Sequence, residues 1–466
     1  MRYLFTPLLF TSLMLLTATG LDWNENLTWH DQHRIEQIGL LGAVALAALV
    51  VWRQDIVSSV MRLPCWVRVM FVLAFSLGLG SALGAAFPRF AALEWATLLL
   101  LLGLVLLLAE EARRAGARFD KWAIWLAVAL AVVIALKIMA GYVAALVEGV
   151  LLDTLWLFEG TFSNRRVFGQ VASMLVPLLA YPLLTGERSR LQRWGLFGLL
   201  AVWWMLVIVS GTRGTWLGLM VATLVLGLAA WQASMRWLRL QVLAAVTGVG
   251  LFVLLFVWIP VWAGLSASVE SRLSNFADLS GRAELWHLAW VQVVAHPWLG
   301  IGPMHLAAIR NDFGAHPHNS LLQLAAEWGV PAALALVLPV LAGMASLLAR
   351  LRKNIGYDVL LVCLTAGLLA ASVQSMVDGV IVIPYTQTLL ALIAGWALGV
   401  YFRGASRVVP DTRLLRLGVP VVSLVAFSAL MYGIYPEVFN RAEVTQAYAD
   451  AGKYIPPRYW GVGWIP

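Results

Sequence analysis

The chain has 466 residues, of which 61% are hydrophobic and only 12% are charged. Soluble domains carry about 25% charged residues, and half of that share cannot cover a soluble surface of this size. The composition therefore predicts a chain surrounded by lipid and excludes a soluble enzyme, a disordered chain and, despite the formal charge of +8, a nucleic-acid-binding protein.

Apolar segments of about 17–25 residues, the length that crosses a bilayer as a helix, recur along the whole chain. The first one resembles a signal peptide but lacks a convincing small-residue cleavage site, so we expect it to remain as a span. Thirteen such segments begin near Tyr3, Ile38, Val69, Ala91, Trp122, Gly169, Leu196, Trp216, Gln241, Leu321, Val359, Thr388 and Leu417. The pattern predicts an all-α fold, a polytopic transmembrane helical bundle of about 12–13 spans, with residues 1–466 as a single integral membrane domain.

The Lys and Arg residues predict how this bundle is oriented, because loops rich in these residues stay in the cytoplasm. If the N-terminus is cytoplasmic, every second loop should be basic. The loops that meet this rule contain, together with Arg2, 20 of the 32 basic residues. All seven histidines then fall on the opposite, outer face. We therefore expect the chemistry of the protein at the outer face.

Two long segments lie on this outer face. Residues 263–320 form the longest connection, and loops longer than about 12–15 residues are usually functional or disordered. Within it, Ala283 to Val294 has the apolar spacing of an amphipathic helix, so we expect a folded catalytic loop that lies against the bilayer. Residues 434–466 form an aromatic, proline-containing tail. This tail and the segment Leu21 to Gln37 are candidates for binding an acceptor.

Arginines on the outer face are the first candidates for chemistry, because ionisable groups beside a membrane are costly and the orientation rule does not explain these. Arg213 lies among small residues that leave its guanidinium accessible. Arg282 opens the amphipathic helix, which leads to Gly300 and Gly302, two residues that permit a tight turn. The guanidinium fork suits bidentate phosphate binding. Each arginine could instead anchor in lipid headgroups, and Arg282 could pair with Glu284.

Two histidines precede one of the predicted spans. His316 and His318 flank a proline, and Asn319 follows them. A histidine here can serve as a general base near neutral pH, and the positive end of a helix dipole favours its neutral form. A structural role is the alternative, and the sequence leaves open which of the two histidines is the base. Asn319 or Ser320 is predicted to cap the following helix.

Several familiar catalytic motifs are absent from the sequence. It contains no HExxH, no Walker loop, no GxSxG nucleophile elbow and no Asp-x-Asp pair that would hold a divalent ion beside a diphosphate. His316 and His318 are a poor zinc pair by themselves. The chemistry that remains is a site without a metal or another cofactor, in which arginines bind a phosphate leaving group.

Taken in order, these contexts resemble the bacterial O-antigen ligase family. The family includes lipopolysaccharide O-antigen ligases, protein and pilin O-oligosaccharyltransferases and, more distantly, O-antigen polymerases. Its pattern is an arginine in a small-residue segment, an arginine-led Trp helix that ends in Pro-x-x-Gly-x-Gly, and a His-Asn pair that opens the next span. In this chain the pattern is met by Arg213, by the segment from Arg282 to Gly302, and by His318-Asn319. Glu327-x-Gly329 follows them.

The resemblance implies a GT-C-like membrane glycosyltransferase of the bacterial inner (cytoplasmic) membrane, with its active site facing the periplasm. The reaction would be metal-independent and inverting, and it would need no cofactor. The donor would be a glycan linked to undecaprenyl diphosphate, and the acceptor would be lipid A–core. Membrane lipids would surround the protein, and no nucleic acid would bind to it.

The resemblance also implies roles for particular residues. Arg213 and Arg282 would hold the diphosphate, and His318 would activate the acceptor hydroxyl. Substrate-binding positions would include the basic pair Arg165 and Arg166, which match a segment before the sixth span. The remaining substrate-binding candidates are His316, Asn319 and, by a looser match, Asp378.

Three other functions fit parts of the sequence. A protein O-oligosaccharyltransferase would use the same catalytic residues and deliver the glycan to Ser or Thr of a pilin or another periplasmic protein. An O-antigen polymerase is a more distant alternative. A transporter would also have many spans, but transporters usually keep polar residues near the midplane of the membrane and contain repeats. Here the polar candidates gather at one face, which favours glycosyl transfer.

Overall fold

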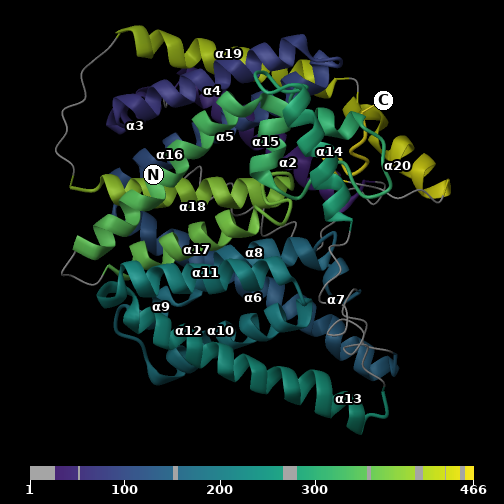
Figure 1. Cartoon of the computed structure of the whole chain (residues 1–466). Coiled ribbons are helices and arrows are strands. Elements are labelled where there is room, and N and C mark those ends of the chain that lie inside the picture. Colours follow the sequence, from purple (N-terminus) through teal and green to yellow (C-terminus); the bar gives the residue numbers. More distant parts are fainter. Residues whose placement is uncertain are drawn as a thin grey trace. The chain divides into compact units, whose positions relative to one another are not determined.

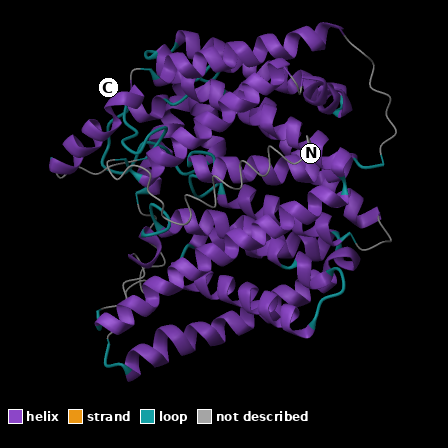
Figure 2. Ribbon diagram, turned by 180° about the vertical axis from the view of Figure 1, so that it is seen from behind, coloured by secondary structure: helices purple, strands orange, loops and turns teal. Residues whose placement is uncertain are grey.

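The computed structural model describes residues 27–50, 53–150, 156–265, 281–353, 358–404, 413–435, 437–451 and 457–465. Every regular element in these residues is a helix (Figures 1 and 2). Within the described part, nine helices are long and apolar enough to cross a membrane, and two shorter ones are also apolar. The predicted all-α, polytopic membrane fold is therefore confirmed. The direction in which the helices cross the membrane stays a prediction.

The helices group into two compact units, each assembled from separate stretches of the chain. The first unit comprises Met1–Asp22, Ala117–Asp278 and Ala345–Gln374, and the second comprises Trp23–Gly116, Leu279–Met344 and Ser375–Pro466. Helix α16 (Val330–Lys353) begins in the second unit and ends in the first. The organisation of residues 1–466 as a single membrane domain stays a prediction.

Glycines set the packing of the first unit. Its other described helices are α6 (Ala117–Glu148), α7 (Trp156–Glu159), α8 (Arg165–Leu179), α9 (Tyr181–Leu184), α10 (Arg190–Ser210), α11 (Arg213–Ala229), α12 (Trp231–Phe252), the π-helix η2 (Val253–Trp258), α13 (Ile259–Trp262) and α17 (Val359–Gln374). A Cβ on Gly218 of α11 would lie 2.5 Å from the carbonyl oxygen of Ala370, and one on Gly367 of α17 would lie 3.1 Å from that of Met174. Helices that meet at glycines approach closely and bury their polar backbones against each other.

The second unit is organised around the long helix α5. It contains α2 (Trp29–Val50), α3 (Arg53–Arg62), α4 (Cys65–Gly84), α5 (Pro88–Ala115), α14 (Arg282–Ala295), the 3-10 helix η4 (His305–Ala308), α15 (Ser320–Trp328), α18 (Pro384–Phe402), α19 (Arg413–Ile434), the 3-10 helix η5 (Glu437–Asn440) and α20 (Arg441–Asp450). Helix α18 packs along α5, where a Cβ on Gly399 would lie 2.5 Å from the carbonyl oxygen of Ala109. This close approach again requires glycine.

One of the predicted spans begins later than expected, at Val330. The segment expected to begin near Leu321 is broken, because α15 ends at Trp328 and α16 begins at Val330. Gly329 lies between them with a φ of 85°, which is left-handed and stops the helix. Helix α15 has only 9 residues and is too short to cross a bilayer. The other predicted spans coincide with helices, except that the one near Tyr3 lies outside the described residues.

Candidate functional site

A tight turn brings the end of α14 back against the end of α15. Gly300 and Gly302 have φ values of 67° and 110°, as the predicted turn requires. The backbone N–H of Gly302 donates to the carbonyl of Glu327 at 3.0 Å. A Cβ on Gly329 would lie only 2.2 Å from the carbonyl oxygen of Trp298. The segment from Gly300 to Gly302 and Gly329 thus take part in the same backbone contact, which fixes the end of α14 against the end of α15.

Helix α14 presents one face to the loop that carries the two histidines. Trp286 donates its indole N–H to the carbonyl of Pro317 at 2.8 Å. At the start of the helix, Gly281 leaves no room for a Cβ, which would lie 2.2 Å from the ring of Phe313. Arg282 lies one turn before Trp286, so both residues share this face. A helix is thus present where one was predicted, and it begins at Arg282.

His318 occupies a strained position next to a carboxylate. Its φ is 52°, in the left-handed region that non-glycine residues rarely adopt, and such strain is concentrated at functional sites. Its Nδ1 lies 3.9 Å from an oxygen of Asp378, and its side chain keeps 18% of its surface exposed. The next residue, Asn319, caps α15 by accepting the N–H of Leu322 at 3.0 Å, as predicted. The strained residue therefore places its imidazole beside a carboxylate, one residue before the N-cap of α15.

His316 lies beside His318 but has a different environment. Its residue is only 4% exposed, and its Nδ1 accepts the backbone N–H of His318 at 3.3 Å. The centres of the His316 and His318 imidazole rings are 4.1 Å apart. A Cβ on Gly379 would lie 2.8 Å from the His316 ring, so this ring is packed against the loop that carries Asp378. The more exposed His318 is consequently the better placed of the two to meet a substrate.

Asp378 lies in a loop, residues 375–383, whose start is held by hydrogen bonds from Ser320. At the first end, the N–H and the hydroxyl of Ser320 both donate to the carbonyl of Ser375 at 2.9 Å. Asp378 itself accepts the N–H of Gly379 at 2.8 Å. Since Ser320 is the first residue of α15, these bonds tie the Asp378 loop to the helix that follows the histidines.

The remaining candidate arginines lie in the first unit, at the starts of two helices. Arg165 and Arg166 are the first two residues of α8, and Asn164 caps this helix by accepting the N–H groups of Arg166 and Val167. Arg213 is the first residue of α11, and its side chain is exposed. Helix N-termini carry a partial positive charge and free N–H groups, so each of these ends favours an anion.

Close packing puts these two helix starts side by side. A Cβ on Gly169, in the second turn of α8, would lie 2.4 Å from Oγ1 of Thr215 and 2.5 Å from Oγ1 of Thr212. Both threonines belong to the start of α11, where the two hydroxyls are hydrogen-bonded at 2.9 Å. Gln374 donates to Thr215 at 3.2 Å. The first unit therefore gathers Arg165, Arg166 and Arg213 at one end.

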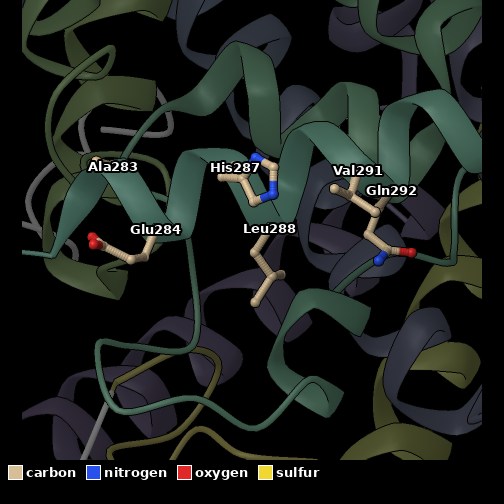
Figure 3. A pocket seen from close by; sticks show the side chains of 6 residues that line it. All are labelled: Ala283, Glu284, His287, Leu288, Val291 and Gln292. Carbon is tan, nitrogen blue, oxygen red and sulfur yellow. The ribbon is translucent and has the colours of Figure 1, made fainter.

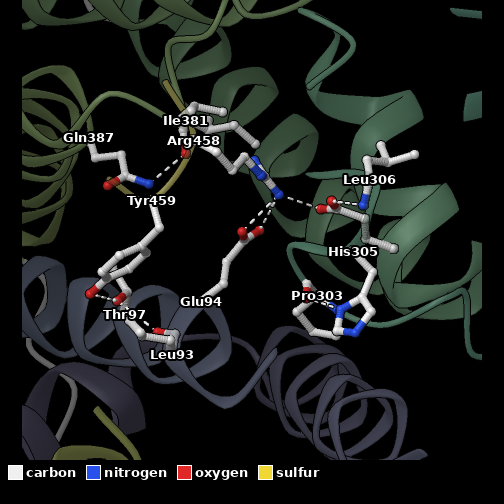
Figure 4. Close-up of polar contacts among 12 residues, drawn as sticks. Leu93, Glu94, Thr97, Pro303, His305, Leu306, Ile381, Gln387, Arg458 and Tyr459 are labelled. Atoms are coloured by element: carbon white, nitrogen blue, oxygen red, sulfur yellow. Dashed lines mark hydrogen bonds and ion pairs between the residues drawn. The ribbon is translucent and has the colours of Figure 1, made fainter. Parts of the chain in front are cut away.

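A buried ion cluster in the second unit was not anticipated from the sequence. The guanidinium of Arg458 pairs with Glu94 at 2.7 Å and with Glu327 at 2.5 Å (Figure 4). Burial and the nearby Glu94 raise the pKa of Glu327, and Arg458 partly opposes this rise. Glu327 also accepts the N–H of Leu306 at 3.0 Å. Of its members, only Glu327 stood out in the sequence, in the Glu-x-Gly segment that follows His318-Asn319.

His305, close to this cluster, has a structural role. Its Nε2 accepts the N–H of Phe87 at 2.9 Å, and its Nδ1 lies 2.9 Å from the carbonyl of Pro303. Both ring nitrogens are thus occupied in the neutral form. Burial lowers the pKa of His305, which keeps it neutral.

A shallow hollow lies along the opposite side of α14. Glu284, His287, Leu288 and Val291 line it together with Ala283 and Gln292 (Figure 3). Glu284, His287 and Val291 lie about half a helical turn away from the buried stripe of Leu285, Ala289 and Val293, whereas Leu288 packs against that stripe. The hollow therefore does not belong to the face of α14 that carries Arg282 and meets the histidine loop.

Metal-ligating side chains do not cluster in the part of the chain that the structure describes. No group of three or more His, Cys, Asp or Glu residues there could hold a metal ion.

Residues 196–337 match the family model described as O-antigen ligase, a range that includes Arg213, Arg282 and His318. This region belongs to the O-antigen ligase family. The match supports a membrane glycosyltransferase of the O-antigen ligase or polymerase kind, and it confirms the resemblance noted in the sequence. Among curated proteins, none matches the chain.

Proposed function

We propose that this O-antigen ligase family protein moves a preassembled glycan from undecaprenyl diphosphate to a hydroxyl group of lipid A–core, at the periplasmic face of the bacterial inner membrane. The observation that carries the proposal is the placement of His318 beside Asp378 and at the start of α15. Helix α14, with Arg282 at its start, borders the same loop through Trp286.

His318 is the general base in this proposal. Its Nδ1 faces the carboxylate of Asp378, which leaves Nε2 to accept the proton of the acceptor hydroxyl. A carboxylate next to an imidazole orients the ring and stabilises the imidazolium that forms when the proton arrives. General-base catalysis of this kind contributes about 10²–10⁴-fold.

The arginines stabilise the leaving group. When the bond between the anomeric carbon and the diphosphate oxygen breaks, its electron pair stays on the diphosphate, whose negative charge grows. In this proposal the guanidinium forks of Arg213 and Arg282 would donate to these oxygens, and Arg165 and Arg166 at the start of α8 would add positive charge. Fixed donors aimed at developing charge usually contribute more to catalysis than any other effect, and each donor is worth about 10²–10³-fold.

The bonds and protons balance without a metal or a cofactor. The acceptor oxygen forms the new bond to the anomeric carbon, its proton passes to His318, and undecaprenyl diphosphate leaves. Because the acceptor attacks from the face opposite the leaving group, the configuration at the anomeric carbon inverts. His316 and Asn319 support this geometry by fixing the backbone of the His318 loop and the start of α15.

The acceptor is tested by offering purified full-length protein two substrates in parallel. Synthetic undecaprenyl-diphosphate glycan is supplied with either lipid A–core or a periplasmic pilin, and products are separated by mass. We expect glycosylated lipid A–core with the wild-type protein and none with His318→Ala. Transfer to pilin alone would replace the proposed acceptor with a protein, while polymerised donor without either product would assign the chain to polymerisation.

A further inference from the structure

Arg34 is a fully buried cation that forms no salt bridge within the described residues. It lies in the second turn of α2 and is only 1% exposed. Its guanidinium donates to two backbone carbonyls, those of Tyr459 and Val382, both at 2.8 Å. Its other acceptors are the side-chain oxygens of Gln37 and of Gln387, the latter at 2.9 Å. A buried charge is costly, and here hydrogen bonds to neutral groups, together with the nearby carboxylates of Asp31 and Glu94, balance that cost.

One end of this network holds the loop that carries Asp378. Arg34 binds the carbonyl of Val382, and Gln387 donates to that of Ile381 (Figure 4). Thr386 donates to the carbonyls of residues 380 and 383 at 2.9 Å and 3.1 Å. Four successive carbonyls of the loop are thereby fixed by side chains. Asp378 precedes them by two residues, so its position depends on how this backbone is held.

The other end of the network is the C-terminal segment, residues 457–465. The guanidinium of Arg34 lies 4.3 Å from the centre of the Tyr459 ring and also binds the Tyr459 carbonyl. His30 lies 3.0 Å from the same carbonyl, and the N–H of Gly461 donates to Asp31 at 2.8 Å. The segment is therefore packed into the second unit through the start of α2.

We propose that Arg34 is a positioning residue that links the C-terminal segment to the Asp378 loop and so holds Asp378 against His318. This inference rests on the proposed function, in which Asp378 orients the base. Arg34 touches neither of these two side chains and acts only through the backbone of residues 380–383. The C-terminal segment then contributes to the reaction without meeting the substrate.

Arg34→Lys tests this role while keeping the charge. A lysine ammonium is a point donor and cannot bind the Val382 carbonyl, the Tyr459 carbonyl and both glutamines together. We expect kcat for transfer to fall by about 10- to 100-fold, as small displacements of catalytic groups do, with the KM for the donor unchanged. Arg310→Lys is the matched control. Arg310 also binds the C-terminal segment, at the Ile465 carbonyl, but does not contact the Asp378 loop.

A double-mutant cycle separates positioning from a general loss of structure. If Arg34 acts through Asp378, the variant Arg34→Lys/Asp378→Asn should be no slower than Asp378→Asn alone, because the same interaction is lost only once. Losses that multiply, or a rise in donor KM instead of a fall in kcat, would overturn the proposal.

Amide hydrogen exchange gives a readout that does not depend on activity. Arg34→Lys should speed exchange in residues 379–383 and leave α14 protected, whereas Arg310→Lys should leave both protected. Unchanged exchange in residues 379–383 would overturn the positioning role even if transfer were impaired. Faster exchange there in a protein whose wild type transfers no glycan would instead refute the proposed function and leave the structural link standing.

Discussion

Gly169→Ala tests whether the arginines of the first unit act as one anion site. The added Cβ would lie 2.4 Å from Oγ1 of Thr215 and 2.5 Å from Oγ1 of Thr212, whereas ordinary contacts are 3.4–4 Å. The starts of α8 and α11 must therefore separate by about 1 Å, since overpacked contacts force the backbone apart. This shift moves Arg165 and Arg166 away from Arg213.

We expect the variant to lose about 10- to 100-fold in kcat/KM for the lipid-linked donor, because a 1 Å misplacement of binding groups can cost that much. Its stability should fall by about 1–3 kcal/mol. The assay is transfer from labelled donor at varied concentration, with thermal unfolding measured in the same detergent. Gly198→Ala, in α10, is the control, because nothing lies within 4 Å of its added Cβ. Wild-type kcat/KM in Gly169→Ala would refute the idea that the two helix starts bind one diphosphate.

Four further predictions concern single groups. His318→Ala should abolish transfer while leaving expression intact, whereas His316→Ala should only slow transfer. Kinetics of both purified variants would check this, and the reverse order would make His316 the base. Arg213→Lys should lose at least about 10-fold in kcat/KM, since an ammonium cannot reproduce the guanidinium fork, and unchanged kinetics would favour a headgroup anchor. Chelators should leave transfer unaffected, whereas loss of activity that Mg²⁺ or Mn²⁺ restores would contradict a metal-free site. Because the pKa of Glu327 is raised in the folded protein, this residue contributes to stability at low pH, and that contribution is lost as the pH rises through the raised pKa. The unfolding temperature of Glu327→Gln should therefore fall less at alkaline pH than that of the wild type.

Local features of the site were predictable from the sequence. Asn319 caps α15 because a short polar side chain next to an apolar run satisfies the free N–H groups of a helix start. Gly300 and Gly302 form the expected turn because both residues can adopt left-handed φ values. Each of these outcomes depends on a few neighbouring residues, which the sequence displays directly.

Features that join distant parts of the chain were harder to predict. The break at Gly329 was missed because apolar residues predominate on both sides of it, and only the approach of the Trp298 carbonyl shows why the helix stops there. Asp378 was a loose match, and its distance to His318 depends on how the loop after α17 packs. Arg34 carried no motif at all, since its partners lie about 350 and 425 residues away in the chain.

The structure also revises the interpretation of the terminal segments. The residues around Arg34 and those around Tyr459 were candidates for binding an acceptor. In the described residues, Arg34 and Tyr459 are buried, and each contacts the other. Burial on this scale favours a structural contribution to the second unit, and the exposed surfaces elsewhere remain for the acceptor.

The central claim is that the protein transfers the glycan directly from undecaprenyl diphosphate with His318 as the base. The most direct measurement is a single-turnover reaction of purified wild type and His318→Ala with synthetic donor and lipid A–core, in which released undecaprenyl diphosphate and the anomeric configuration of the product are determined together. The account predicts one undecaprenyl diphosphate for each inverted glycosidic bond with the wild type and neither product with the variant. Retention of configuration, or equal rates for both proteins, would contradict it.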